Sequence, residues 1–203
     1  MNSKVAALVP VVVLLLGLVV PPATRADSSQ LVRNYLDERG ATGYTIVPIT
    51  DDYVQNTFPG VDFFSVWFRQ YPVAALPPEG LAFSNVFFVI DSGVGFLTDP
   101  SGLETAFLEG LGPVSDVDAA RDVARTWLRL SQEFSQDGFF VFTQPKAEPL
   151  PVENPWARWA IGGQVLVAEG GSGEIDVIML FDVMGNLANV QESRDVQIGS
   201  RPI

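Results

Sequence analysis

Apolar side chains recur at helical spacing close to the start of the chain. After residue 26 the recurring positions are Leu31, Val32, Tyr35 and Leu36. Asp27, with Gln30 three residues later, predicts the N-cap of a helix, and Gly40 predicts its end. We therefore expect a short amphipathic helix that buries one face.

A second and longer helical pattern begins at Ser115. Its apolar positions are Val117, Ala120, Val123, Ala124, Trp127, Leu128 and, two turns later, Phe134. This stripe is typical of a helix packed on one side, and Gly138 predicts its end. Another helix is expected after Asp99 and Pro100, because Asp99 is a good N-cap and proline is favoured at the first helical position.

Strand-like segments follow both helical patterns. The first set is Tyr44–Ile49, 63–71, 82–90 and 94–97, with a helical turn at 51–58 and a hairpin at 91–93. Pro48 favours an edge position for the first of these strands. The second set is 139–142, 156–169, 174–183 and 187–198. The glycine-rich turn 170–173 and the turn 184–186 are short, so the last three strands are expected to be antiparallel neighbours.

Four prolines separate the strand at 139–142 from the later ones. They are Pro145, Pro149, Pro151 and Pro155. Because proline has no amide hydrogen, we expect 144–155 to be a linker that does not pair with a strand.

These elements predict an α+β fold in which helices pack on antiparallel sheets. Residues 27–112 and 113–203 share one order of elements: a helix, a glycine, an aromatic-led strand, a proline-bearing loop, two long strands, a tight turn and a return strand. This order indicates two similar helix-and-sheet units. The alternative to an internal duplication is chance recurrence, which the low residue identity between the halves favours.

A helix followed by an antiparallel meander resembles the layout of cystatin-like domains, and the likeness is one of architecture only. The cystatin inhibitory motif is Gln-x-Val-x-Gly, and its nearest counterpart is Gln164-Val165-Leu166-Val167-Ala168. Leu166 and Ala168 replace the valine and the glycine of that motif, in the middle of an expected strand. The likeness therefore does not predict protease inhibition.

The first 26 residues have the pattern of a secretory signal peptide. Lys4 precedes an uncharged run at 5–20, and Pro21, Pro22 and the small residue Ala26 follow it. We expect export and cleavage after Ala26, which predicts a secreted or periplasmic protein of a bacterial envelope. The alternative is a retained membrane anchor, because the run falls just short of the roughly 20 residues that span a bilayer.

Composition excludes most familiar catalytic classes. The chain has no histidine and no cysteine, which excludes Ser-His-Asp and Cys-His catalysis, Cys/His zinc sites and thiol redox chemistry. Beyond residue 26 its single lysine is Lys146, in the proline-rich segment. Asp116, Asp118 and Asp122 lack the glycine and glutamate of a calcium loop, and they are expected to favour a helix start. We therefore predict no cofactor and no metal site.

The acidic balance restricts the partners. The formal net charge is −12, and removal of residues 1–26 would take away Lys4 and Arg25 and no acid, which leaves −14. Such a surface repels nucleic acids and anionic lipids. We expect a protein or a small ligand as the partner, no nucleic acid, and membrane contact only if the N-terminal segment is retained.

A row of arginines is the most distinctive basic feature. Arg121, Arg125 and Arg129 lie four residues apart on the long helix, a spacing that could grip an anionic ligand. Asp118 and Asp122 precede the first two arginines by three residues, so ion pairing on a solvated face is the alternative and the favoured interpretation.

Trp156 and Arg158 form a second candidate ligand-binding pair. Alternation along the expected strand places both side chains on one face, where tryptophan beside arginine can stack on a sugar or another planar ligand. The alternative is that tryptophan in this region packs in the core.

Carboxylates leave one enzymatic alternative. Glycoside hydrolysis needs two acids, one of them in an apolar pocket that raises its pKa. The last strands carry the acids Glu169, Glu174, Asp176 and Asp182. Acids at these positions usually face water, so the sequence assigns no catalytic residue.

The sequence favours an exported, non-catalytic protein that binds a partner protein or a ligand. Binding is expected on a sheet surface or in a cleft between the two helix-and-sheet units. The alternatives are a carboxylate-dependent envelope hydrolase and a membrane-anchored accessory subunit.

Overall fold

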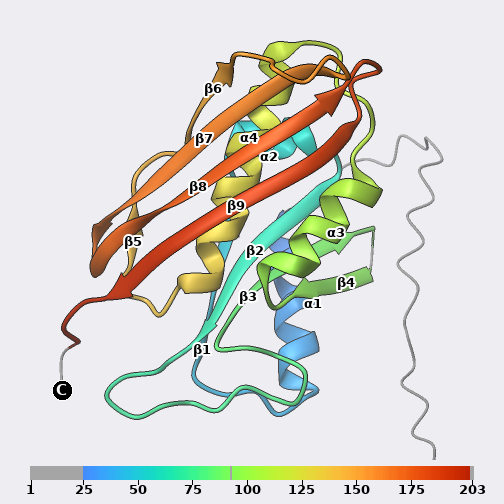
Figure 1. Cartoon of the computed structure of the whole chain (residues 1–203). Helices are drawn as coiled ribbons and strands as arrows, with labels where there is room; N and C mark the ends of the chain where they lie inside the picture. The colour runs from blue at the N-terminus through green and yellow to red at the C-terminus, as the bar shows by residue number, and fades with distance from the viewer. Residues whose placement is uncertain (1–24, 92, 202–203) are drawn as a thin grey trace, which may run out of the picture.

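The computed structural model describes residues 25–91 and 93–201, and it arranges them in four layers (Figure 1). The helix α1 (Arg25–Asp37) covers one face of an antiparallel sheet whose order is β1 (Tyr44–Ile49), β2 (Val61–Phe68), β3 (Ser84–Ile90) and β4 (Gly93–Leu97). The next layer contains α2 (Asp52–Thr57), α3 (Pro100–Gly110), α4 (Val117–Ser131) and the 3-10 turn η1 (Gln132–Ser135). The last layer is the second antiparallel sheet, made of β5 (Val141–Phe142), β6 (Lys146–Leu150), β7 (Ala157–Glu169), β8 (Gly171–Asp182) and β9 (Leu187–Ile198).

Both faces of the first sheet are covered. On β2 the side chains of Phe64 and Val66 pack in the cluster that contains α1, whereas Phe63 belongs to the cluster that contains α4. A strand buried on both faces is apolar over a continuous run rather than at alternate positions. Ser65 is the polar exception within this run. It is 2% exposed and donates a hydrogen bond to the carboxylate of Glu133.

The helix α4 lies between the two sheets and contacts both. It packs against α2 and, on another side, against β7 and β8, and its buried side chains share one cluster with residues of both sheets. Trp127 is 2% exposed and packs edge-on against Phe107 of α3, with 5.1 Å between ring centroids. The predicted apolar stripe of this helix is confirmed, and it explains why one core serves both sheets.

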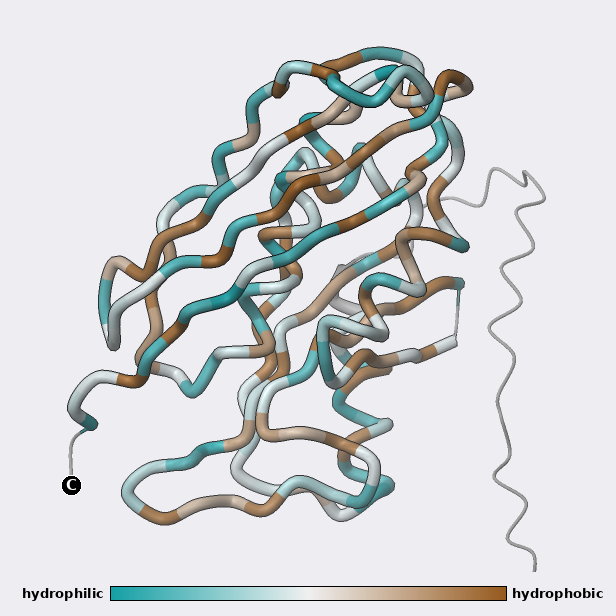
Figure 2. Tube along the Cα trace, viewed as in Figure 1, coloured by the Kyte–Doolittle hydropathy of each residue, from teal (hydrophilic) through white to brown (hydrophobic). Residues whose placement is uncertain are grey.

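The second sheet has one buried face and one solvent-facing face. Along β8 the side chains of Ile175, Val177, Met179 and Phe181 are buried. The residues between them are exposed or half-buried. This alternation of burial is typical of an antiparallel sheet with one wet face. Figure 2 shows that the strands of this sheet carry both hydrophilic and hydrophobic residues, and Ile178 is a hydrophobic residue on the wet face.

The predicted α+β class is confirmed, and β1 lies at a sheet edge as Pro48 indicated. Asp116 caps α4, because its carboxylate accepts a hydrogen bond from the Ala119 amide at 2.9 Å. One helix start differs from the prediction. The helix α1 begins at Arg25, so Asp27 lies within it and not at its cap.

The prediction that 144–155 forms no strand pairing was wrong. Within this segment β6 pairs with β7, and Pro149 lies opposite Ile161. Proline removes hydrogen bonding on one side of a strand only, and β6 is at the sheet edge, where that side can face away from the neighbour.

Each sheet is preceded in sequence by a helix, α1 for the first sheet and α4 for the second. The element order of the two halves is therefore similar, whereas the division at residues 112 and 113 stays a prediction. The signal-peptide prediction falls almost wholly on residues outside those that the structure describes. Within residues 25–91 and 93–201, no helix has the length and apolarity needed to cross a bilayer.

Candidate functional site

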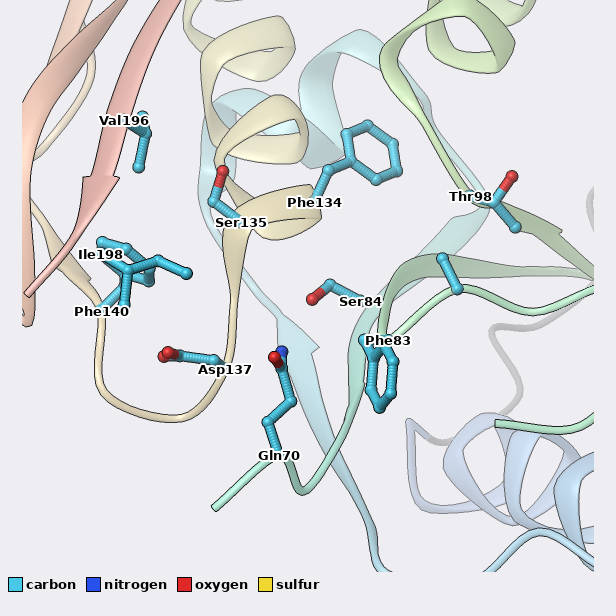
Figure 3. A pocket seen from close by; sticks show the side chains of 11 residues that line it. Gln70, Phe83, Ser84, Thr98, Phe134, Ser135, Asp137, Phe140, Val196 and Ile198 are labelled. Carbon is cyan, nitrogen blue, oxygen red and sulfur yellow. The ribbon is translucent and has the colours of Figure 1, made fainter. Parts of the chain in front are cut away.

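A cleft of about 300 Å³ opens between the two sheets (Figure 3). The first sheet and its flanking segments contribute Gln70, Phe83, Ser84 and Thr98, the second sheet contributes Val196 and Ile198, and η1 contributes Phe134 and Ser135. These residues lie far apart in the sequence and meet only because both sheets pack on the α4 layer. The volume is at the lower end of the range for small-molecule pockets.

Gln70 is the polar side chain of the cleft with unused hydrogen-bonding capacity. Its amide points into the cleft (Figure 3), and it makes no hydrogen bond to another residue that the structure describes. By contrast, the Ser84 hydroxyl donates to the carbonyl of Gln136, and the Ser135 hydroxyl accepts from Arg194 at 2.7 Å. The cleft thus combines one open amide with apolar walls, which suits a ligand of mixed polarity.

Among the described residues that line the cleft, Asp137 is the one with a charged side chain. Its charge is balanced by Arg201 of the same chain. Its carboxylate lies 2.6 Å from Nε of Arg201, and the two side chains are 3% and 5% exposed. The Arg201 guanidinium also lies over the ring of Phe140, 4.7 Å from the centroid. Asp137 is therefore a structural group that holds the wall of the cleft and not an open ligand-binding charge.

The sequence alone did not predict the ion pair between Asp137 and Arg201. Asp137 and Arg201 are separated by 64 positions, and neither belongs to a motif. The one local signal is Gly138, whose φ of +91° allows the chain to turn sharply beside Asp137.

The arginine row lies on α4 as predicted, but each guanidinium is paired with carboxylates of the same chain. Arg121 lies 3.3 Å from Asp118 and 3.0 Å from Glu148. Arg125 lies 3.2 Å from Asp122. The ion-paired interpretation of these two arginines is confirmed. An anion that bound this row would have to displace those carboxylates.

Arg129 is the most buried member of the row, with 16% of its side chain exposed. Nε lies 2.8 Å from Asp51, and Nη1 pairs with Glu133, which is itself 4% exposed. Burial lowers the pKa of Arg129, but the charges of Glu133 and Asp51 outweigh it, so its pKa is raised. Burial first, and then the Asp51 charge, raise the pKa of the neighbouring Tyr53 phenol. This cluster joins α2, α4 and β2 and has no open cationic face.

Trp156 and Arg158 are both exposed, and the ring on which Arg158 stacks is not Trp156. Trp156 precedes β7 and is 79% exposed, and its amide donates to the Asn154 side chain at 3.0 Å. The Arg158 guanidinium lies over Trp159 instead, 4.0 Å from the ring centroid. A register irregularity between Ala157 and Trp159 interrupts the alternation on which the prediction depended.

The four acids weighed for hydrolysis do not face one another across a cavity. Glu169 and Glu174 are exposed, and Asp176 and Asp182 are half-buried. Hydrogen bonds from the side chain and backbone of Asn186 lower the pKa of Asp182, the opposite of what a general acid requires. Asp182 instead organises the turn between β8 and β9.

Among the described residues, no group of three or more acidic side chains is placed to hold a metal ion. Asp116 caps α4, while Asp118 and Asp122 pair with arginines. The helix-start interpretation of Asp116 is confirmed.

A second, more open depression of about 400 Å³ lies on the second sheet. Gly162 forms part of its floor, and Leu150, Gln164, Asp176 and Ile178 surround it. It draws its lining from the second sheet alone, whereas the cleft between the sheets draws its lining from both halves of the chain.

No family model, curated protein or solved structure matches the chain. The cleft between the sheets is therefore a candidate site because of the arrangement of its own residues, and no relative supports the assignment.

Proposed function

We propose that the protein is an exported, non-catalytic binding protein whose ligand or partner occupies the cleft between the two sheets. The supporting observation is that both halves of the chain line this cleft while its charged residue is neutralised internally. A site with an open amide and apolar walls recognises a ligand by shape and hydrogen bonding. The described lining contains one carboxylate, Asp137, which Arg201 already binds, and it contains no second acid or base to act with it.

The proposed location follows from the N-terminal pattern at 1–26. N-terminal sequencing by mass spectrometry of the protein from the producing cells tests it. A first residue of Asp27 supports export with cleavage, whereas Met1 in a membrane fraction would support the alternative, a membrane-anchored accessory subunit.

Binding is tested by recording amide NMR spectra of the full chain during a screen of small molecules and short peptides. We expect shift changes to gather at Phe83, Ser84 and Ser135. The variant Thr98→Trp fills the cleft and is expected to abolish them, whereas Thr105→Trp, the same change at an exposed position on α3, is expected to leave them unaltered.

Shift changes confined to the solvent-facing side of the second sheet would reject the cleft as the site. Turnover of a substrate that stops when a single carboxylate is neutralised would reject the non-catalytic assignment and support a hydrolase instead.

A further inference from the structure

The strand β9 is the longest edge strand of the two sheets in the described chain. It has 12 residues, it pairs with β8 and with no other strand of the described chain, and it contains neither proline nor glycine. An edge strand carries backbone groups without a partner strand, and proteins usually protect such edges from pairing with other chains.

The other edges of the two sheets carry such protection. In the first sheet β1 contains Pro48, and β4 has 5 residues of which Gly93 and Gly95 are two. In the second sheet β5 has 2 residues, and β6 has 5 and contains Pro149. Short length and proline are devices that prevent strand addition. The edge of β9 lacks both.

The strand β9 carries three charged side chains, Glu192, Arg194 and Asp195. The inward-facing Glu192 and Arg194 pair with each other at 3.1 Å and bind the α4 layer, where Arg194 donates to the Ser131 carbonyl at 2.8 Å. Inward-pointing charges can protect a sheet edge, but these two already pair with each other and with α4. The third charge, Asp195, is exposed, and its carboxylate accepts a hydrogen bond from Gln197 at 3.3 Å.

The register of β9 identifies the backbone groups that face the open edge. The Gly199 amide donates to the Gly170 carbonyl at 3.0 Å, and pairing alternates from there along the two strands. The carbonyls of Asp195 and Gln197 point toward β8, where they would lie 1.7 and 2.1 Å from a Cβ added at Gly173 and Gly171. The amides of the alternate residues, Glu192, Arg194, Val196 and Ile198, therefore face away from β8.

The open half of this edge borders the cleft. Val196 and Ile198 line the cavity (Figure 3), whereas α3 lies beside the first half of β9 (Figure 1). A strand added next to Val196 would direct every second side chain toward the cleft and the others toward solvent.

We propose that the cleft binds an extended peptide segment of a partner protein, which adds to β9 as a further strand; this inference depends on the proposed function. The segment alternates apolar side chains, which enter the cleft, with polar or basic ones. Charge favours this occupant over a second copy, because each chain carries a net charge of −12 and two copies would repel each other.

The test begins with peptides of about ten residues, selected from a random displayed library on the full chain and then synthesised. Amide hydrogen exchange is measured with and without the selected peptide. We expect Arg194 and Val196 to gain protection while Ser193, Asp195 and Gln197, already paired with β8, change little. Protection elsewhere, or a library that yields no binder, would overturn strand addition.

Backbone methylation of the peptide provides a second readout that needs no protein variant. Methyl groups on the peptide amides that face β9 are expected to weaken binding by about tenfold or more, whereas methyl groups on the alternate amides are expected to change it less than about twofold. Equal effects in both registers would contradict the proposal.

A matched pair of variants tests the location. Val196→Lys places a charge at the cleft edge and is expected to weaken peptide binding by about tenfold, whereas Gln197→Lys adds the same charge on the opposite face and is expected to leave binding unchanged.

If ligands shift the cleft amides but do not protect the Val196 amide, strand addition fails while cleft binding stands. Sedimentation of the full chain as a dimer through β9 would assign the edge to self-association instead.

Discussion

Arg194 and Glu192, two residues apart on β9, form an ion pair at 3.1 Å, and both side chains bind α4. The Glu192 carboxylate accepts hydrogen bonds from Trp127 at 2.7 Å and from Ser131 at 2.5 Å. Arg194 in turn donates to Ser135. The last strand of the second sheet is therefore fastened to the central helix by polar contacts, although that strand lies at the sheet edge.

Arg194→Met is expected to destabilise the protein by about 3 kcal/mol, because it leaves the partly buried Glu192 carboxylate without its counter-charge. Arg121→Met is the matched control, since its partners Glu148 and Asp118 are 70% and 83% exposed. The control is expected to cost less than about 1 kcal/mol. Urea unfolding of both variants measures the difference, and equal losses would contradict the structural role of the Arg194 pair.

The two tryptophans Trp127 and Trp156 are expected to differ sharply in their effect on stability. Trp127 is 2% exposed and Trp156 is 79% exposed. Trp127→Ala is expected to cost about 3–5 kcal/mol through the cavity it leaves, and Trp156→Ala less than about 0.5 kcal/mol. Thermal unfolding checks this, and a large loss at Trp156 would mean that its side chain packs in the folded protein.

Gly170 and Gly40 both have positive φ, +82° and +67°, but only Gly170 lies against other backbone. A Cβ at Gly170 would lie 2.2 Å from the Phe139 carbonyl oxygen, whereas a Cβ at Gly40 meets nothing within 4 Å. We expect Gly40→Ala to cost about 1 kcal/mol and Gly170→Ala about 3 kcal/mol or more in the free energy of unfolding. Similar values for the two variants would show that the 170 turn can move away.

The N-cap of α3 predicts a pH dependence. Hydrogen bonds from the Ser101 side chain and the Gly102 amide lower the pKa of Asp99. Its carboxylate therefore stabilises the fold above the unfolded-state pKa of about 3.9, and this contribution is lost as the pH falls through the lower folded-state pKa. Asn is a comparable cap that does not titrate. Asp99→Asn is thus expected to lose less stability than the native chain between about pH 6 and about pH 3 in urea unfolding. If the native chain and Asp99→Asn lost equal stability over this pH range, the proposed role of the Asp99 carboxylate would be contradicted.

Local patterns predicted most of the fold. The stripe through Val123 and Trp127 identified the central helix, and Asp99 identified a helix start, because periodicity and capping are properties of neighbouring residues. The error at Pro149 has a different cause. Whether a proline is tolerated depends on which side of the strand faces a neighbour, and that is decided by the sheet rather than by the segment.

The candidate site was less predictable than the fold. The sequence placed Arg121 and Arg125 beside acids three residues away, and the structure confirms those pairs. The cleft depends instead on residues from Gln70 to Ile198, whose proximity follows from two sheets packing on one helix. No spacing rule connects such distant positions. A cleft between two units was a sequence hypothesis, but none of its lining residues was singled out.

The central position of α4 has a consequence for how the chain comes apart. A fragment ending near residue 112 would lack this helix, so Phe63 and Val86 would be exposed to solvent. A fragment starting near residue 113 would keep the helix but would expose the side of it that packs against the first half of the chain. Neither piece retains an intact interior, so heating or denaturant is expected to melt both sheets in a single cooperative step.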